Sequence, residues 1–225
     1  MSEDSKAIEE TAKAIGKGID VADKVGTFIA PLIKGSLEQG IGIFEDKLKY
    51  ARWERQVRLM CRATEFMKKC GITEVINPIP LKFAVPLLQG ASLEDDDELQ
   101  DLWAKLLVNA ISNKGIELRR VYIDILERLS PLEAKIIDKI YSIPFNENQH
   151  KFLVTYLLPD NMEVITEGKS ETDYPRLSNK DIEMALIDLA RIGCISPMRS
   201  IGGGEIYSFI NLTHLGNNFH EACTL

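Results

Sequence analysis

The sequence has few of the residues that most often carry chemistry. Among its 225 residues are only three histidines and four cysteines. The cysteines form no Cys-x-x-Cys pair of the kind that zinc or dithiol redox sites use, and they stand at Cys61, Cys70, Cys194 and Cys223. His214 and His220 are six residues apart, which misses the i, i+4 spacing of a helical zinc pair. No phosphate-binding loop or nucleophile elbow occurs. The sequence therefore predicts a non-enzymatic protein with no catalytic residue, metal site or cofactor.

Long hydrophobic runs are also missing. The longest uncharged stretch near the N-terminus is Val25 to Ile33, nine residues, whereas a membrane-spanning helix needs roughly 20. The acidic, polar start MSEDSKAIEE is unlike a secretory signal. Together with the unpaired cysteines, this favours a reduced, cytoplasmic protein. Peripheral contact with the inner membrane remains open, because an apolar helix face can lie in a membrane interface.

The sequence lacks an excess of basic charge. Its formal net charge is −7 and its pI is about 5.1. Residues 1–60 are neutral overall, whereas residues 129–225 carry 8 basic and 13 acidic side chains. Nucleic-acid binders usually present a basic face. Nucleic acid is therefore an improbable partner, and self-association or another protein is favoured.

An apolar stripe on a long helix is the clearest feature of the N-terminal region. Apolar or small residues recur from Ile8 to Leu48 at steps of three and four, which is typical of one face of a helix. Pro31 predicts a kink or break near Ala30. Six glycines between positions 16 and 42 favour close helix packing or conformational freedom. We expect partner or membrane contact from Ile15, Ile19, Phe28, Ile29, Ile33, Ile41 and Phe44.

A strongly charged helix is predicted over residues 46–70, ending at Gly71. Its buried side would contain Trp53, Val57, Met60 and Phe66. Its basic residues fit a solvated face that is interleaved with Glu45, Asp46 and Glu54. Nucleic-acid binding by this stretch is the weaker alternative.

The central region is expected to hold an irregular connector and one helix. Pro78, Pro80 and Pro86 favour extended backbone before them. Ser92 would cap the following helix, with Asp95 completing a capping box. The acidic run 94–98 fits the positive end of that helix dipole better than a metal site. Trp103, on the apolar face, is a further candidate partner contact.

The C-terminal third has clear helix starts and a β-hairpin. Ser130-Pro131-Leu132-Glu133 predicts one helix, Ser178 with Asp181 a second, and Thr213 a short last one. Gly202-Gly203-Gly204 would turn a hairpin between the last two helices. This order is typical of a winged helix-turn-helix, which usually binds DNA through its second helix. Here that helix is net acidic, so protein interaction or dimerisation is favoured over DNA binding.

These patterns predict a mainly α-helical fold with three regions. Residues 1–72 would form long amphipathic, glycine-rich helices, and residues 73–128 a connector and central helix within a helical bundle. Residues 129–225 would form a winged-helix-like domain with a small β-hairpin.

Three stretches of the sequence resemble the bacterial abortive infection alpha family. They are PLLQGASLEDDDELQDLWAKLLVNAI (86–111), VYIDILERLSPLEAKIIDKI (121–140) and LTHLGNNFHEAC (212–223). Many members of that family have a His-Pro pair before the Leu-Ser-Pro helix, where this chain has Arg119-Arg120-Val121. The resemblance implies a part in antiphage defence, without an established reaction, cofactor or catalytic residue.

The leading hypothesis is therefore a non-enzymatic defence protein. Its C-terminal domain and the Trp103 helix would bind partners, and its N-terminal stripe would oligomerise or engage a membrane. The alternatives are a winged-helix DNA-binding transcriptional regulator and a scaffold or immunity partner of a toxin.

Overall fold

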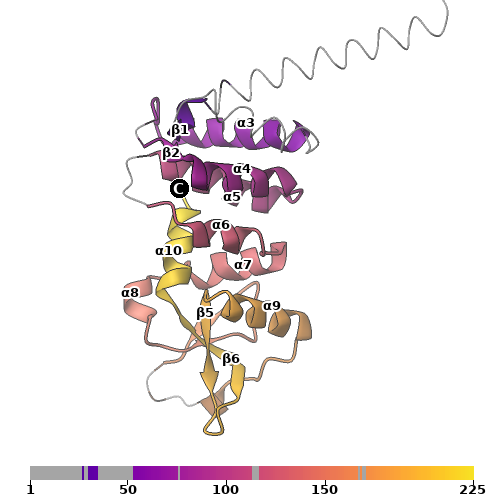
Figure 1. Ribbon diagram of the computed structural model, residues 1–225. Coiled ribbons are helices and arrows are strands. Elements are labelled where there is room, and N and C mark those ends of the chain that lie inside the picture. The colour runs from indigo at the N-terminus through magenta and orange to yellow at the C-terminus, as the bar shows by residue number, and fades with distance from the viewer. Residues whose placement is uncertain are drawn as a thin grey trace, which may run out of the picture. The chain divides into compact units, whose positions relative to one another are not determined.

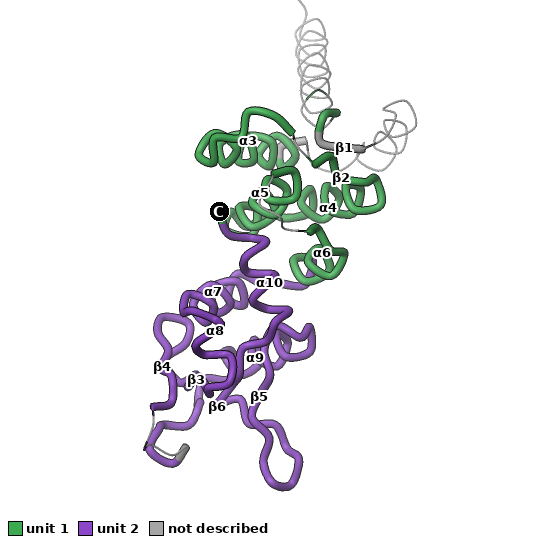
Figure 2. Tube along the Cα trace, turned by 90° about the vertical axis from the view of Figure 1, so that its left-hand side faces the viewer, with its two compact units in different colours: residues 1–126, 225 green, residues 127–224 purple. Residues whose placement is uncertain are grey.

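The computed structural model divides the chain into two compact units (Figure 2). Unit 1 comprises residues 1–126 with Leu225, and unit 2 comprises residues 127–224. The residues that the structure describes are 27, 30–34, 53–75, 77–112, 117–166, 168 and 171–225. Over these residues the fold is mostly helical with a small antiparallel four-stranded sheet, as the sequence predicts at this level.

Unit 1 is a group of helices, with α3, α4 and α5 packed against one another (Figure 1). Its helices are α3 (Trp53–Lys69), α4 (Leu81–Leu93), α5 (Asp97–Ile111) and α6 (Arg120–Leu126). A short parallel pair joins β1 (Ile33–Lys34) to β2 (Ile79–Pro80). Helix α3, which was expected to belong with the N-terminal region, thus packs with the central helices in one unit.

The core of unit 1 centres on Trp103, whose side chain is only 1% exposed. Gly90 of α4 lies against its ring: a Cβ atom at Gly90 would be 2.5 Å from the indole Cη2. The contact therefore requires a residue without a side chain. Helix α3 contributes a narrow buried face, spaced three and four residues apart, of Gln56, Leu59, Ala63 and Phe66.

The predicted irregular connector is wrong over much of its length, because residues 81–93 form α4. Pro86 lies inside this helix, where it removes one backbone donor. Ala84, Leu87, Leu88 and Ala91 are nevertheless buried on one side of the helix. Burial of that apolar face outweighs the local cost of the proline.

The predicted cap at Ser92 is also wrong. Ser92 lies in the last turn of α4, where its hydroxyl donates to the carbonyl oxygen of Gln89 at 2.8 Å. Helix α5 starts five residues later, at Asp97, and the carboxylate of Asp96 caps it by accepting from the amides of Glu98 and Leu99. Asp96 satisfies amides that the helix itself cannot pair.

The break predicted at Pro31 is confirmed. Residues Ala30–Leu32 form a 3₁₀ turn, and Ile33 continues into β1, where it pairs in parallel with Ile79. Ile33 therefore lies in a strand and not in the predicted helix. The expected long helices on either side of this break lie outside the described residues.

Unit 2 combines helices with the four-stranded sheet, whose order is β4-β3-β6-β5 (Figure 1). Its main elements are α7 (Pro131–Ile140), α8 (Phe145–Asn148), β3 (Leu153–Val154), β4 (Glu163–Val164), α9 (Lys180–Arg191), β5 (Ile195–Arg199), β6 (Glu205–Leu212) and α10 (His214–Ala222). All neighbouring strands in this sheet pair antiparallel. The predicted hairpin is thus confirmed as β5–β6, and Gly203 in its turn has φ 84°.

The helix caps of unit 2 largely match the predictions. At α7, Ser130 and Glu133 form the reciprocal capping box, with Pro131 in the first turn. Thr213 caps α10 by accepting from the amide of Gly216 at 3.0 Å. The cap of α9 differs by one residue, because Asn179 and not Ser178 accepts from the amides that start the helix.

Candidate interaction surfaces

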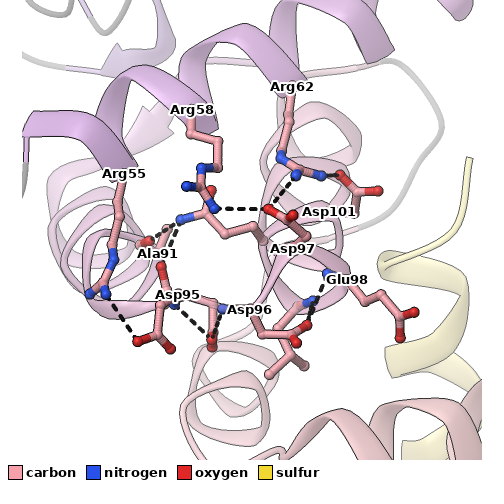
Figure 3. Close-up of polar contacts among 12 residues, drawn as sticks. Arg55, Arg58, Arg62, Ala91, Asp95, Asp96, Asp97, Glu98 and Asp101 are labelled. Atoms are coloured by element: carbon pink, nitrogen blue, oxygen red, sulfur yellow. Dashed lines mark hydrogen bonds and ion pairs between the residues drawn. The ribbon is translucent and has the colours of Figure 1, made fainter.

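Helices α3 and α5 are joined by a row of ion pairs, which we call the arginine–aspartate ladder (Figure 3). Its members are Arg55, Arg58 and Arg62 of α3, with Asp95, Asp97 and Asp101 at the start of α5. The arginines are spaced three and four residues apart, which places them along one side of α3. Asp97 and Asp101 are four residues apart on α5, and Asp95 lies two residues before the helix begins. The six side chains therefore meet as two facing rows.

The ladder has specific geometry. Arg55 Nη2 lies 3.0 Å from Asp95 Oδ2, and Arg58 Nη1 lies 2.8 Å from Asp97 Oδ1. Arg62 bridges two carboxylates, at 2.8 Å from Asp97 and in contact with Asp101. Arg55 also donates to the carbonyl oxygen of Leu93, where α4 ends. The arginines thus connect α3 to the ends of both neighbouring helices.

The two rows differ in exposure. The arginine side chains are 22–33% exposed, whereas those of Asp95 and Asp97 are 77% and 71% exposed. Solvent and salt therefore reach the carboxylates of these pairs directly. Exposed ion pairs of this kind contribute only about 0–1 kcal/mol each to stability.

The ladder corrects the sequence-based interpretation of both charged segments. Arg55 and Arg58 were expected on a solvated face, but they bind carboxylates about 40 residues away. The acidic run was assigned to the helix dipole; Asp96 does cap the helix, while its neighbours Asp95 and Asp97 bind arginines. Spacing along one helix cannot reveal a partner on another helix, and the only signal in the sequence was the opposite charge of the two segments.

Polar atoms are buried beside the ladder, between the helices of unit 1. Gln56 Nε2 and Gln100 Oε1 are buried without a hydrogen-bond partner among the described residues. Gln100 uses its Nε2 to donate to the carbonyl oxygens of Ala91 and Glu94, both at 3.0 Å. A buried unpaired polar atom costs about 1–3 kcal/mol. Among the described residues, the interior of unit 1 is therefore partly polar.

In unit 2, two large apolar side chains are exposed. Met184 on α9 is 57% exposed, and Ile201 in the β5–β6 turn is fully exposed. The charges on α9 are mixed: Lys180 and Arg191 against Asp181, Glu183 and Asp188, all exposed. Arg191 lies within ion-pair distance of Asp188 on the same helix, at 4.0 Å. This arrangement offers apolar contact points without a basic surface.

The buried polar groups of unit 2 hold its elements together. The Tyr141 hydroxyl donates to the carbonyl oxygen of Cys194 at 2.5 Å and accepts from the amide of Thr213 at 3.0 Å. Burial raises the pKa of Tyr141 to about 12, and burial also raises the pKa of the Cys194 thiol to about 12. Both groups are therefore neutral at ordinary pH. Cys194 has none of the thiolate character that a nucleophile needs.

The predicted contact residues are not brought together in the part of the chain that the structure describes. Trp103 lies in the core of unit 1, where its ring contacts this chain's own residues, and Ile33 lies in β1. The remaining candidates, Ile15, Ile19, Phe28, Ile29, Ile41 and Phe44, lie outside the described residues.

The described residues contain neither a candidate metal site nor a candidate membrane-spanning helix. Among them, no three histidine, cysteine or acidic side chains are grouped so that they could hold a metal ion. The ring of His214 instead contacts the ring of Phe145 edge to face, and His220 Nε2 lies 3.5 Å from Asp138 Oδ1. Within the same residues, no helix is both long and apolar enough to cross a bilayer.

The fold and these surfaces define a mostly helical, two-unit protein whose charged rows connect helices. The family model named abortive infection alpha matches residues 54–223 of the 225. The chain therefore belongs to the abortive infection alpha family, as its motifs suggested. The match includes both rows of the ladder and all of the C-terminal sheet. No curated protein and no solved structure matches the chain.

Proposed function

We propose that this chain serves abortive infection, the defence function that its family suggests, through non-enzymatic interactions. Unit 2 would bind a protein partner, and the N-terminal apolar stripe would self-associate or engage a membrane. The non-enzymatic part of this proposal is supported by the groups whose pKa values are strongly raised. These groups are buried or are hydrogen-bonded to other parts of the fold. Tyr141, for example, bonds to two backbone segments of unit 2.

The observation that carries the partner-binding proposal is the exposure of Met184 and Ile201. Both belong to a unit whose interior is already filled by residues such as Leu186, Ile210 and Phe219. Methionine adapts its shape easily and is frequent at protein-binding surfaces. Exposed apolar side chains on a helix and on a hairpin turn fit protein contact better than catalysis.

A winged-helix interpretation of unit 2 supports the same proposal. The chain order α7, β3, α9 and the β5–β6 hairpin, with β6 between β3 and β5 in the sheet, fits that fold. In it, α9 would be the helix that reads DNA in nucleic-acid-binding members. Because α9 is net acidic, we assign the unit to protein interaction. The second candidate function is regulation of transcription, because the same topology occurs in DNA-binding proteins.

Deletion of residues 1–45 tests the role of the stripe. The deletion removes the stripe and β1 but keeps helices α3 to α10. We therefore expect the shortened protein to fold and to lose its toxicity and its protection against phage. Circular dichroism would measure folding, growth of cells expressing the protein would measure toxicity, and a plaque assay would measure protection. Full toxicity of the shortened protein would contradict the proposal.

The double variant Met184→Ser, Ile201→Ser tests partner binding by unit 2. We expect loss of phage protection with an unchanged melting temperature, because both side chains are exposed. The matched control is Leu225→Ser, which alters another exposed apolar residue and should keep protection. Equal protection by both variants would exclude this surface.

A further inference from the structure

Helix α3 combines a charged row with a weakly apolar buried face. Its outer contact to α5 consists of the arginines of the ladder, and its buried face contains three apolar residues, Leu59, Ala63 and Phe66. The fourth buried residue, Gln56, has an amide nitrogen with no partner among the described residues. The fully buried contact of α3 is therefore small and partly polar, and the ladder adds the charged pairs that connect α3 to α5.

The partners of the arginines are accessible to competitors. Asp95 and Asp97 are more than two-thirds exposed, so water and ions surround their carboxylates. Guanidinium groups bind phosphate oxygens in the same bidentate manner as carboxylates. A surface that offers many phosphate groups can therefore take the place of the aspartates along the same side of α3.

We propose that Arg55, Arg58 and Arg62 form a binding surface for anionic lipid headgroups, and that Asp95, Asp97 and Asp101 occupy this surface in the closed unit. The aspartates act as an autoinhibitory contact. Exchange of carboxylates for lipid phosphates frees α3 from α5 and holds it at the membrane. This inference rests on the proposed membrane engagement, and it names the lipid class and the residues that would select it.

The small number of arginines and the chain order favour a membrane over a nucleic acid. The whole chain carries a net charge of −7, which opposes extended contact with DNA and with an anionic membrane alike. Three arginines suit a local contact with a negatively charged leaflet, where each basic residue contributes about 1 kcal/mol. In the sequence, α3 follows the apolar stripe directly, so the two would reach the same surface.

The test compares binding of full-length protein to phosphatidylcholine vesicles with and without phosphatidylglycerol. In the variant Asp95→Asn, Asp97→Asn, Asp101→Asn the arginines lose their ion pairs with these three carboxylates, while the Asp96 cap stays. We expect this variant to bind the anionic vesicles about tenfold or more tightly than wild type. Adding Arg55→Gln, Arg58→Gln and Arg62→Gln should remove the gain.

The matched control neutralises three exposed carboxylates of unit 2: Glu147→Gln, Asp160→Asn and Glu163→Gln. It changes net charge equally and should alter vesicle binding by less than about threefold. Equal gains in the control and the aspartate variant would overturn the proposal. So would tighter binding of the aspartate variant to duplex DNA than to anionic vesicles, because the arginines would then select nucleic acid.

A second measurement does not depend on the aspartate variant folding. Hydrogen exchange of wild-type α3 should become faster with phosphatidylglycerol vesicles and stay unchanged with phosphatidylcholine alone. Unchanged exchange with both vesicles would overturn the autoinhibitory contact. If wild type binds both vesicles equally through residues 1–45, the proposed membrane function stands and only the arginine surface fails.

Discussion

At the scale of single residues, the structure requires glycine at positions where a Cβ atom would overlap a neighbouring segment. Gly216 of α10 is one: a Cβ atom there would overlap the Tyr141 hydroxyl and the carbonyl oxygen of Cys194. Gly90 is the equivalent in unit 1, against the ring of Trp103. The sequence alone indicates neither demand, because each depends on which residue a distant segment brings close.

Gly90→Ala should destabilise unit 1. The added methyl group would lie 2.5 Å from Cη2 and 2.8 Å from Cζ2 of Trp103, so the helices must separate. Overpacking of this kind costs about 1–3 kcal/mol, measurable by urea unfolding. The control is Gly202→Ala, where the nearest atom is 4.0 Å away. Equal stability of the two variants would contradict the tight packing of Gly90 on Trp103.

Unit 2 should lose stability at alkaline pH. Burial raises the pKa of Cys194 from 9.0, and that of Tyr141 from 10.0, to about 12 each. The unfolded chain releases these protons first, so their contribution is fully present below pH 9 and lost as pH rises toward 12. Chemical unfolding between pH 8 and 12 would measure the loss. Cys194→Ala should remove the part of it that starts near pH 9, and an unchanged profile would refute the assignment.

At the scale of secondary-structure elements, local signals predicted well where capping decides the boundary. The start of α7 follows from Ser130, Pro131 and Glu133 alone, because a capping box acts within four residues. The start of α5 could not be predicted from the local sequence, because Ser92 and Asp96 are both good capping residues. The packing of α4, which includes Ser92, decides between them. Tertiary burial likewise made a helix around Pro86.

The ladder also belongs to the element scale, and its stabilising effect should depend on salt. Asp97→Asn removes pairs with both Arg58 and Arg62, which should cost about 1 kcal/mol at low ionic strength. At 1 M NaCl the screening length falls to about 3 Å, so the difference from wild type should largely disappear. Urea unfolding at two salt concentrations measures it. The control is Glu65→Gln, which removes an exposed ion pair within α3. A loss of stability in Asp97→Asn that does not depend on salt would instead indicate that Asp97 acts through its position in the first turn of α5.

At the scale of the whole molecule, the uneven distribution of charge separates two candidate functions. The excess of acidic residues is concentrated in residues 129–225, in the unit that we propose to be a winged helix. A DNA-binding member of that class needs basic residues on α9 and the hairpin. Here the exposed basic groups are Lys180, Arg191 and Arg199. Lys180 and Arg191 have acidic residues within three positions, and Arg199 lies opposite Glu205 in the hairpin.

We therefore expect no specific, salt-sensitive binding of the full-length protein to duplex DNA, even at low ionic strength. Phosphate contacts supply most of the affinity for DNA, and three partly offset basic residues cannot supply it. A gel-shift titration with promoter fragments at 20 and 200 mM salt would measure binding. Lys180→Gln with Arg191→Gln should then change nothing. If wild type does bind DNA and this double variant does not, unit 2 reads DNA through α9, and transcriptional regulation replaces protein interaction as the better account of its fold.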